Sequence, residues 1–185
     1  MNKEKIVELT YEYGGDWAVQ HAERLIHLVA LIGGGLEFDS DVIWLAAYLH
    51  DWGGYEKWTV PGVWHADRSR EVAEEFLAEQ GMSEEMKKVV LDCIQYHHGG
   101  PEDRCIESVL LTDADALDLL GALGMLRIFA MNPRNLKGGY EAAKKFRDMS
   151  TAAITLDKSH TIAADRIKET DNILELFEKE SFGIF

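Results

Sequence analysis

The chain has little that would crosslink it or insert it into a membrane. Only two of its 185 residues are cysteine, and Cys93 and Cys105 form neither a CxxC pair nor the spacing of a disulfide framework. We expect both to be reduced, partly buried thiols. No apolar run approaches the roughly 18 residues of a membrane span, and the start MNKEKIVELTYEYGG lacks the pattern of a signal peptide. These features predict a cytoplasmic protein without a membrane partner.

Basic residues are also scarce. The sequence has 19 Lys and Arg against 33 Asp and Glu, which gives a formal net charge of −14. A groove for a nucleic-acid polymer needs clustered Lys and Arg, so this class of partner is disfavoured. A small phosphorylated substrate remains compatible with the charge, because bound cations can invert the local field.

Alternating, strand-like runs are scarce as well, and apolar residues recur mostly at helical spacing. The pattern predicts an all-α, single-domain helical bundle of about eight helices over residues 1–185. Gly121 or Gly124 would kink the longest of them. The expected helices cover residues 2–13, 16–32, 39–51, 65–80, 83–98, 104–131, 140–156 and 160–179.

Histidine and aspartate side chains occur within or at the ends of these apolar segments. Imidazole and carboxylate groups together suit divalent metals. Burying them without partners would be costly, so a metal or a hydrogen-bond network must satisfy them. We expect one or two ions of Mn, Fe, Ni, Zn or Mg. The candidate ligands are His21, His50, Asp51, His65, His97, His98 and Asp115.

Asp51 is also the candidate catalytic residue, because its two carboxylate oxygens could bridge two ions and orient a water. The alternative is an aspartate that only helps to end a helix. Arg24 and Arg68 lie at helical spacing from His21 and His65, which makes them candidates for binding a substrate phosphate. Ordinary surface salt bridges are the alternative for both arginines.

Three tryptophans, Trp52, Trp58 and Trp64, follow the His50-Asp51 pair. They could line a pocket and stack on a nucleobase, and the segment WTVPGVW could form a lid over it. The alternative is that these side chains cover the core beneath a loop.

The ordered motifs resemble the HD-domain superfamily of metal-dependent phosphohydrolases. The resemblance rests on HAERL, LAAYLHDWGG, HADRSREVA, QYHHGG and LTDADALDLLGALG, and it spans about residues 17–129. It implies an all-helical fold with a mono- or binuclear metal centre that hydrolyses phosphate esters, often of nucleotides. By the same resemblance, one metal is held by His21, His50, Asp51 and Asp115, and the other by Asp51, His65, His97 and His98.

The expected activity is therefore that of a phosphomonoesterase or nucleotidase that uses metal-activated water. Two alternatives stay open: a metal- or nucleotide-binding regulatory module without turnover, and a di-iron oxygenase of similar architecture. Many relatives carry Lys or Glu soon after the HD pair, whereas here Glu56 and Lys57 come later, which leaves the general acid unassigned. The apolar segment GALGMLRIFAM is either core or the interface of a homodimer.

Overall fold

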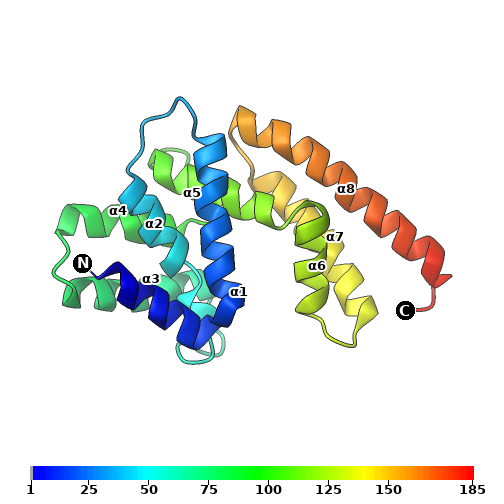
Figure 1. Ribbon diagram of the computed structural model, residues 1–185, viewed down its shortest axis with the longest axis horizontal. Helices are drawn as coiled ribbons and strands as arrows, with labels where there is room; N and C mark the ends of the chain where they lie inside the picture. The colour runs from blue at the N-terminus through cyan, green and yellow to red at the C-terminus, as the bar shows by residue number, and fades with distance from the viewer. Residues whose placement is uncertain (1) are drawn as a thin grey trace. The chain divides into compact units, whose positions relative to one another are not determined.

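The computed structural model describes residues 2–185, which form α-helices and one short 3-10 helix and contain no β-strand (Figure 1). The predicted all-α class is confirmed. The chain divides into two compact units, one up to Thr112 and one from Asp113 to Phe185. One domain over residues 1–185 stays a prediction. The helices are α1 (Lys3–Ile32), α2 (Ser40–Leu49), η1 (Trp52–Gly54), α3 (His65–Glu79), α4 (Glu84–Gln95), α5 (Ile106–Asp118), α6 (Gly121–Ala130), α7 (Leu136–Ala153) and α8 (Asp157–Ser181).

Element α1 consists of two helical segments, as the sequence predicted, which meet at a kink. Asn2 caps its start, because its side chain accepts a hydrogen bond from the Lys5 N–H at 3.1 Å. Gly15 interrupts the helical geometry with φ 68° and ψ −169°, which is the conformation of the kink. Glycine adopts a positive φ at little cost. The predicted boundary between residues 13 and 16 is therefore confirmed at Gly15.

Two other predicted helix starts are confirmed by their caps. The Asp39 side chain accepts hydrogen bonds from the N–H groups of Asp41 and Val42 at the start of α2. The Ser83 hydroxyl accepts from the Met86 N–H at the start of α4. Each cap satisfies backbone donors that have no partner inside the helix.

The first unit surrounds an apolar core. Helix α1 packs on α2, α2 packs on α4, and α3 packs on both α4 and η1. The indole of Trp52 is buried in this core, where it stacks on Trp58 and its Nε1–H donates to the Thr10 hydroxyl at 3.0 Å. The fully buried aliphatic side chains include Leu25, Ile32, Leu45, Leu49, Leu77 and Ile94. Among the described residues, no helix is sufficiently long and apolar to span a membrane.

In the second unit, the predicted helix 104–131 is broken into α5 and α6. Gly121 has φ +75° at the break, and its N–H donates to the Thr170 hydroxyl of α8 at 2.8 Å. Arg166, also on α8, donates to the Leu117 carbonyl at 2.6 Å. These side chains replace the hydrogen bonds that a continuous helix would have made. The expected kink near Gly121 is thus a complete break, stabilised from a distant segment.

Asp113 holds the connection between α7 and α8. Its carboxylate is buried; Oδ1 accepts from the N–H and hydroxyl of Thr155 at 2.9 and 3.0 Å, and Oδ2 accepts from the Leu156 N–H at 2.9 Å. Hydrogen bonds to a buried carboxylate are stronger than those between neutral groups. Asp113 therefore fixes the start of α8.

We expect Asp113→Ala to lower the free energy of unfolding by about 1–3 kcal/mol, because it removes the acceptor of three partly buried hydrogen bonds, two of them from backbone N–H groups. Asp113→Asn keeps one acceptor oxygen and should lose less. Urea denaturation followed by circular dichroism measures both variants. Equal stability of Asp113→Ala and the unsubstituted protein would contradict the assignment.

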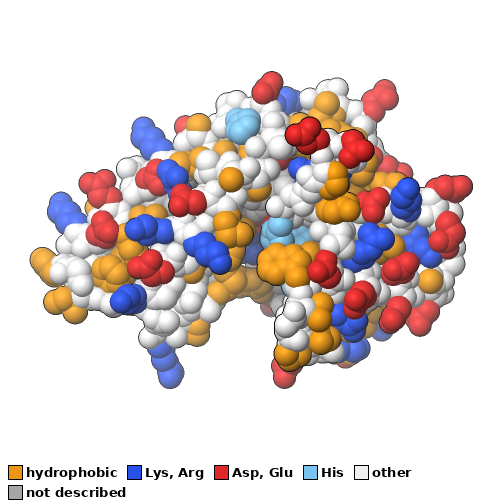
Figure 2. All heavy atoms as spheres, turned by 180° about the vertical axis from the view of Figure 1, so that it is seen from behind, with side chains coloured by type: hydrophobic (Ala, Val, Ile, Leu, Met, Phe, Trp, Pro, Cys, Tyr) orange, Lys and Arg blue, Asp and Glu red, His pale blue; other side chains and the backbone are white. Residues whose placement is uncertain are grey.

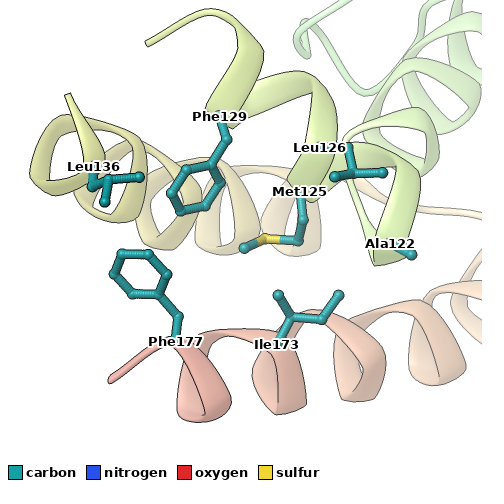
Figure 3. A pocket seen from close by; sticks show the side chains of 7 residues that line it. All are labelled: Ala122, Met125, Leu126, Phe129, Leu136, Ile173 and Phe177. Atoms are coloured by element: carbon teal, nitrogen blue, oxygen red, sulfur yellow. The ribbon is translucent and has the colours of Figure 1, made fainter. Parts of the chain in front are cut away.

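Helices α6, α7 and α8 enclose the core of the second unit. Met125, Ile128 and Ala143 are buried together, with Phe146 and Ile173 packed against them. Beside this core lies an apolar pocket of about 350 Å³, drawn in Figure 3 with Phe129 and Phe177 facing one another across it. Only part of the segment GALGMLRIFAM belongs to the core: Met125 and Ile128 are buried, whereas Leu126 is exposed. The role of the segment in a homodimer stays a prediction.

Candidate metal centre

The His50-Asp51 pair lies where α2 ends and η1 begins. His50 is the C-cap of α2, and Asp51 immediately precedes η1. Gly53 lets this turn approach α3: a Cβ at Gly53 would lie 2.3 Å from the backbone nitrogen of Ser69, and the Gly53 N–H donates to the Ser69 hydroxyl at 2.9 Å. Only glycine fits so close to another backbone. This contact brings the start of α3, and with it His65, to Asp51.

Asp51 lies at the centre of four histidines, and its two oxygens face different pairs. Oδ2 is 3.3 Å from His50 Nε2 and 3.9 Å from His21 Nε2. Oδ1 is 3.6 Å from His65 Nε2 and 3.9 Å from His97 Nε2. Helices α1 and α3 and the turns after α2 and α4 therefore converge on one carboxylate. Its division between two pairs is the arrangement that a carboxylate bridging two cations requires.

Two of these histidines are oriented by backbone carbonyls. His50 Nδ1 is 2.9 Å from the Ala47 carbonyl, and His97 Nδ1 is 2.6 Å from the Ile94 carbonyl. A carbonyl oxygen only accepts, so each Nδ1 donates to it, and each Nε2 lies on the side of the ring that faces Asp51. Metal-binding histidines are commonly held in this way. Each carbonyl belongs to the residue three positions before the histidine, within the last turn of α2 or α4.

A second group consists of His65, His97 and His98. The Nε2 atom of His65 lies 3.2 Å from that of His97 and 2.9 Å from that of His98. Nitrogen lone pairs at this distance repel one another unless a proton or a cation lies between them. A tetrahedral metal with bonds of about 2.0–2.1 Å would hold its nitrogen ligands about 3.4 Å apart. The spacing and donor types thus fit a divalent transition metal.

The first group consists of His21, His50 and Asp51, whose ligand atoms also lie within 4.8 Å of one another. His21 comes from the buried face of α1 and is only 4% exposed. Asp115 is buried on α5 and belongs to the second unit, so its assignment continues to rest on the sequence resemblance. Six of the seven predicted ligands are therefore brought together within the first unit.

The histidines keep Asp51 ionised. Desolvation by the surrounding protein raises the pKa of the Asp51 carboxyl, but the positive charge and hydrogen bond of His50, with further contributions from His21 and His97, lower it more. The pKa therefore lies well below its usual range. The carboxylate is negative at any pH near neutrality, as a metal bridge must be.

Tyr55 is a neighbour of the centre that the sequence analysis missed. Burial raises the pKa of its phenol, and the negative charge of Asp51 raises it further. Tyr55 therefore stays protonated and can only act as a neutral hydrogen-bonding group beside Asp51. Its position four residues after Asp51, at the end of η1, was the available signal.

The two arginines proposed to bind phosphate differ in their surroundings. Arg68 donates from Nε to the Trp58 carbonyl at 2.8 Å and from Nη1 to Glu71 at 2.8 Å, so it holds the loop before α3. Arg24 is half-buried on α1, one turn after His21.

The three tryptophans also differ. Trp52 is 1% exposed, stacked on Trp58 and edge-on to Phe76, so it lies in the core, which is the alternative that the sequence left open, and its role in binding a nucleobase stays a prediction. Trp58 is half-buried against Tyr13. Trp64 is 53% exposed, and its ring centroid lies 4.4 Å from that of His65. Figure 2 shows histidine side chains at the surface beside large hydrophobic ones.

Comparison with known proteins agrees with this arrangement. The HD domain family model matches residues 18–120, which is more than half of the chain and includes every proposed ligand. The chain belongs to the HD domain family. The match also fits the segment of about residues 17–129 that the sequence motifs indicated.

Solved structures share the fold of this HD-domain chain. An HD-superfamily hydrolase from Bacillus thuringiensis is 25% identical, with a TM-score of 0.64 over 96% of this chain and 95% of that one. YpgQ of Bacillus subtilis, crystallised in complex with ADP, is 20% identical, with a TM-score of 0.68 over 96% and 93%. A protein from Lactobacillus plantarum is 16% identical, with a TM-score of 0.74 over 99% of both chains. The sequence matches no curated protein.

Proposed function

We propose that this HD-domain chain is a metal-dependent phosphohydrolase that cleaves a small phosphate ester, such as a nucleotide. The observation that carries the proposal is the position of Asp51, whose two oxygens face separate histidine pairs. His98 adds a third imidazole to one side. On the other side we include Asp115 by sequence resemblance.

Divalent cations in such a centre lower the pKa of water and neutralise charge that develops on a phosphoryl group. The protein's own residues would do the rest. Asp51, held ionised, would orient the attacking water in line with phosphorus. Arg24 would bind the non-bridging phosphate oxygens by charge-assisted hydrogen bonds. Arg68 is the second candidate for that role, after release from Glu71.

Two observations support a nucleotide as the substrate class. YpgQ, which shares the fold, was crystallised with ADP. In this chain, the exposed Trp64 ring lies next to His65 and His98, and its free face offers a stacking surface at the edge of the centre. A base stacked there would place its phosphates toward the histidines.

The first test is elemental analysis of the purified, untagged protein by plasma mass spectrometry, followed by phosphate-release assays with a generic phosphomonoester and a nucleotide panel. We expect one or two equivalents of Mn, Fe, Ni or Zn and turnover of at least one phosphate ester. Protein that contains no metal and takes up none on dialysis would contradict the metal centre. Bound metal without phosphate release would favour the regulatory module, and oxygen consumption by bound iron would favour the oxygenase.

A pair of histidines on α1 gives a matched test. His21 is buried beside Asp51, whereas His27 on the same helix is exposed. We expect His21→Ala to weaken metal affinity by at least about 10-fold, as loss of a metal-site group commonly does, and His27→Ala to leave it unchanged. Isothermal titration with Mn²⁺ measures both. Equal losses in the two variants would indicate a general effect on α1.

A further inference from the structure

A polar cavity lies beside α4, and its lining consists of residues other than the proposed metal ligands. Its volume is about 420 Å³, which is within the usual range for a small-molecule site. One wall is α4 itself, through Lys88, Val89 and Asp92. The facing wall is the segment between α4 and α5, through residues that include Pro101 and Arg104. The cavity is therefore a candidate for a second ligand site in the first unit.

Two cations of this lining have no anionic partner in the protein. Within residues 2–185, Lys88 forms no ion pair. The guanidinium of Arg104 donates only to neutral oxygens, from Nη1 to the Tyr96 carbonyl at 3.3 Å and to the Thr112 hydroxyl at 3.2 Å. Its other N–H groups and the ammonium of Lys88 are available to a ligand. In a chain with a net charge of −14, two such cations at one cavity indicate an anionic ligand.

The two carboxylates of the lining do not cancel these charges. Asp92 is already paired, since its Oδ1 accepts from Arg70 Nη1 at 3.2 Å. Asp103 is exposed and forms no ion pair with any described residue. With Arg70 included, three positive side chains stand against two negative ones, so the cavity has a positive balance. Asp103 is left to accept hydrogen bonds from hydroxyl groups of a ligand.

The remaining lining suits the carbon skeleton of an organic molecule. Val89, Pro101 and the side chain of Tyr96 contribute apolar surface. Gly100 leaves space for the Tyr96 ring, because an added Cβ at this position would lie 2.6 Å from the ring atom Cδ1. The cavity therefore combines unpaired cations with apolar walls, which is the combination that an organic anion requires.

We propose that this cavity binds a small organic phosphate that carries hydroxyl groups, such as a sugar phosphate. The phosphate accepts hydrogen bonds from Arg104 on one wall and from Lys88 on the other. A phosphate group carries a charge of about −1.5 to −2 near neutral pH and has three terminal oxygens, so it can contact cations on two walls at once. Asp103 accepts from the hydroxyl groups, and the carbon skeleton contacts Val89 and Pro101.

Cys105 provides a local measurement of binding. It lines the cavity and is half-buried, whereas Cys93 is 0% exposed and should not react. The experiment measures, by intact mass, the rate at which iodoacetamide alkylates the purified full-length protein at fixed pH as ribose 5-phosphate is added. We expect the rate to fall to a plateau as the cavity fills. Inorganic phosphate should protect only at higher concentration, and uncharged ribose should not protect.

Two neighbouring lysines of α4 give matched variants. Lys88 is exposed at the cavity, whereas Lys87 is paired with Glu84 at 2.8 Å. We expect Lys88→Gln to weaken ribose 5-phosphate binding by at least about 10-fold, the usual effect of losing a charge-assisted hydrogen bond. Lys87→Gln should leave the affinity unchanged. Protection should also be the same with and without EDTA, because the cavity contains none of the proposed metal ligands.

Three outcomes would overturn the proposal. Ribose 5-phosphate could leave the alkylation rate unchanged, ribose could protect as well as its phosphate does, or the variants at Lys88 and Lys87 could lose affinity equally. The second outcome would show that the cations are not used, and the third would place the anion elsewhere. The experiment needs neither metal nor hydrolysis, so its failure is distinguishable from failure of the proposed phosphohydrolase function.

Discussion

Replacing Asp51 by alanine is expected to abolish binding of both proposed cations and to lower phosphate-ester hydrolysis by at least about 100-fold, the upper range for loss of a group that only supports a metal site. The reason is geometric: Oδ2 faces His21 and His50, while Oδ1 faces His65 and His97. Without the carboxylate, the site would also lose the negative charge that offsets the repulsion between two bound cations. Plasma mass spectrometry and a phosphate-release assay measure the two effects.

Two variants sharpen this experiment. Asp51→Asn keeps one oxygen and is expected to bind one cation at most, so the metal stoichiometry should fall in steps from the unsubstituted protein to Asn and then Ala. Asp41→Ala removes an exposed carboxylate from the start of α2, where it pairs with Lys3, and should leave metal content unchanged. Full metal content and activity in Asp51→Ala would refute the candidate centre.

Asp118→Ala is expected to lower the free energy of unfolding by about 3–5 kcal/mol, the usual cost of removing one partner of a buried ion pair. Asp118 is 1% exposed, and its Oδ2 lies 2.5 Å from Nη1 of Arg127, whose side chain is 9% exposed. The variant leaves a buried guanidinium without its carboxylate. For a chain of this length, the melting temperature should fall by about 6–20 °C.

The double variant Asp118→Leu with Arg127→Met is the matched control. Apolar replacement of both partners removes the buried charges together, so we expect a smaller loss than in Asp118→Ala. Differential scanning calorimetry of Asp118→Leu, Arg127→Met and the double variant gives the coupling between the two residues. Additive losses would show that the ion pair contributes nothing beyond the packing of each side chain.

Much of the candidate centre was predictable because His50, Asp51, His65, His97 and His98 lie at or just beyond helix ends that the local sequence marks. Asp39 begins the helix that ends in His50, and Ser83 begins the helix that ends before His97. Caps and glycines are short-range signals that mark the helix ends. The order of the histidine motifs along the chain indicated which of these residues form the centre. The division of the Asp51 oxygens between two histidine pairs needed coordinates, because it depends on how close Gly53 brings the turn to α3.

The features that the sequence left unsettled depend on contacts between distant segments. The break between α5 and α6 is stabilised by Thr170 and Arg166, about fifty residues further along the chain. Trp52 is a core residue because Thr10 and Phe76 surround it. Spacing alone could not show any of these contacts.

The break after α5 also affects where the chain can be cut. The segment matched by the family ends at residue 120, one position before Gly121. A fragment ending there would lose α8, and with it the guanidinium bound to the Leu117 carbonyl and the loop that surrounds Asp113. The Leu117 carbonyl and the Asp113 carboxylate, which α8 and the segment before it otherwise cover, would then be exposed to water. The boundary of sequence similarity is therefore not a boundary of cooperative folding, and shortened versions should retain the chain through Thr170 at least.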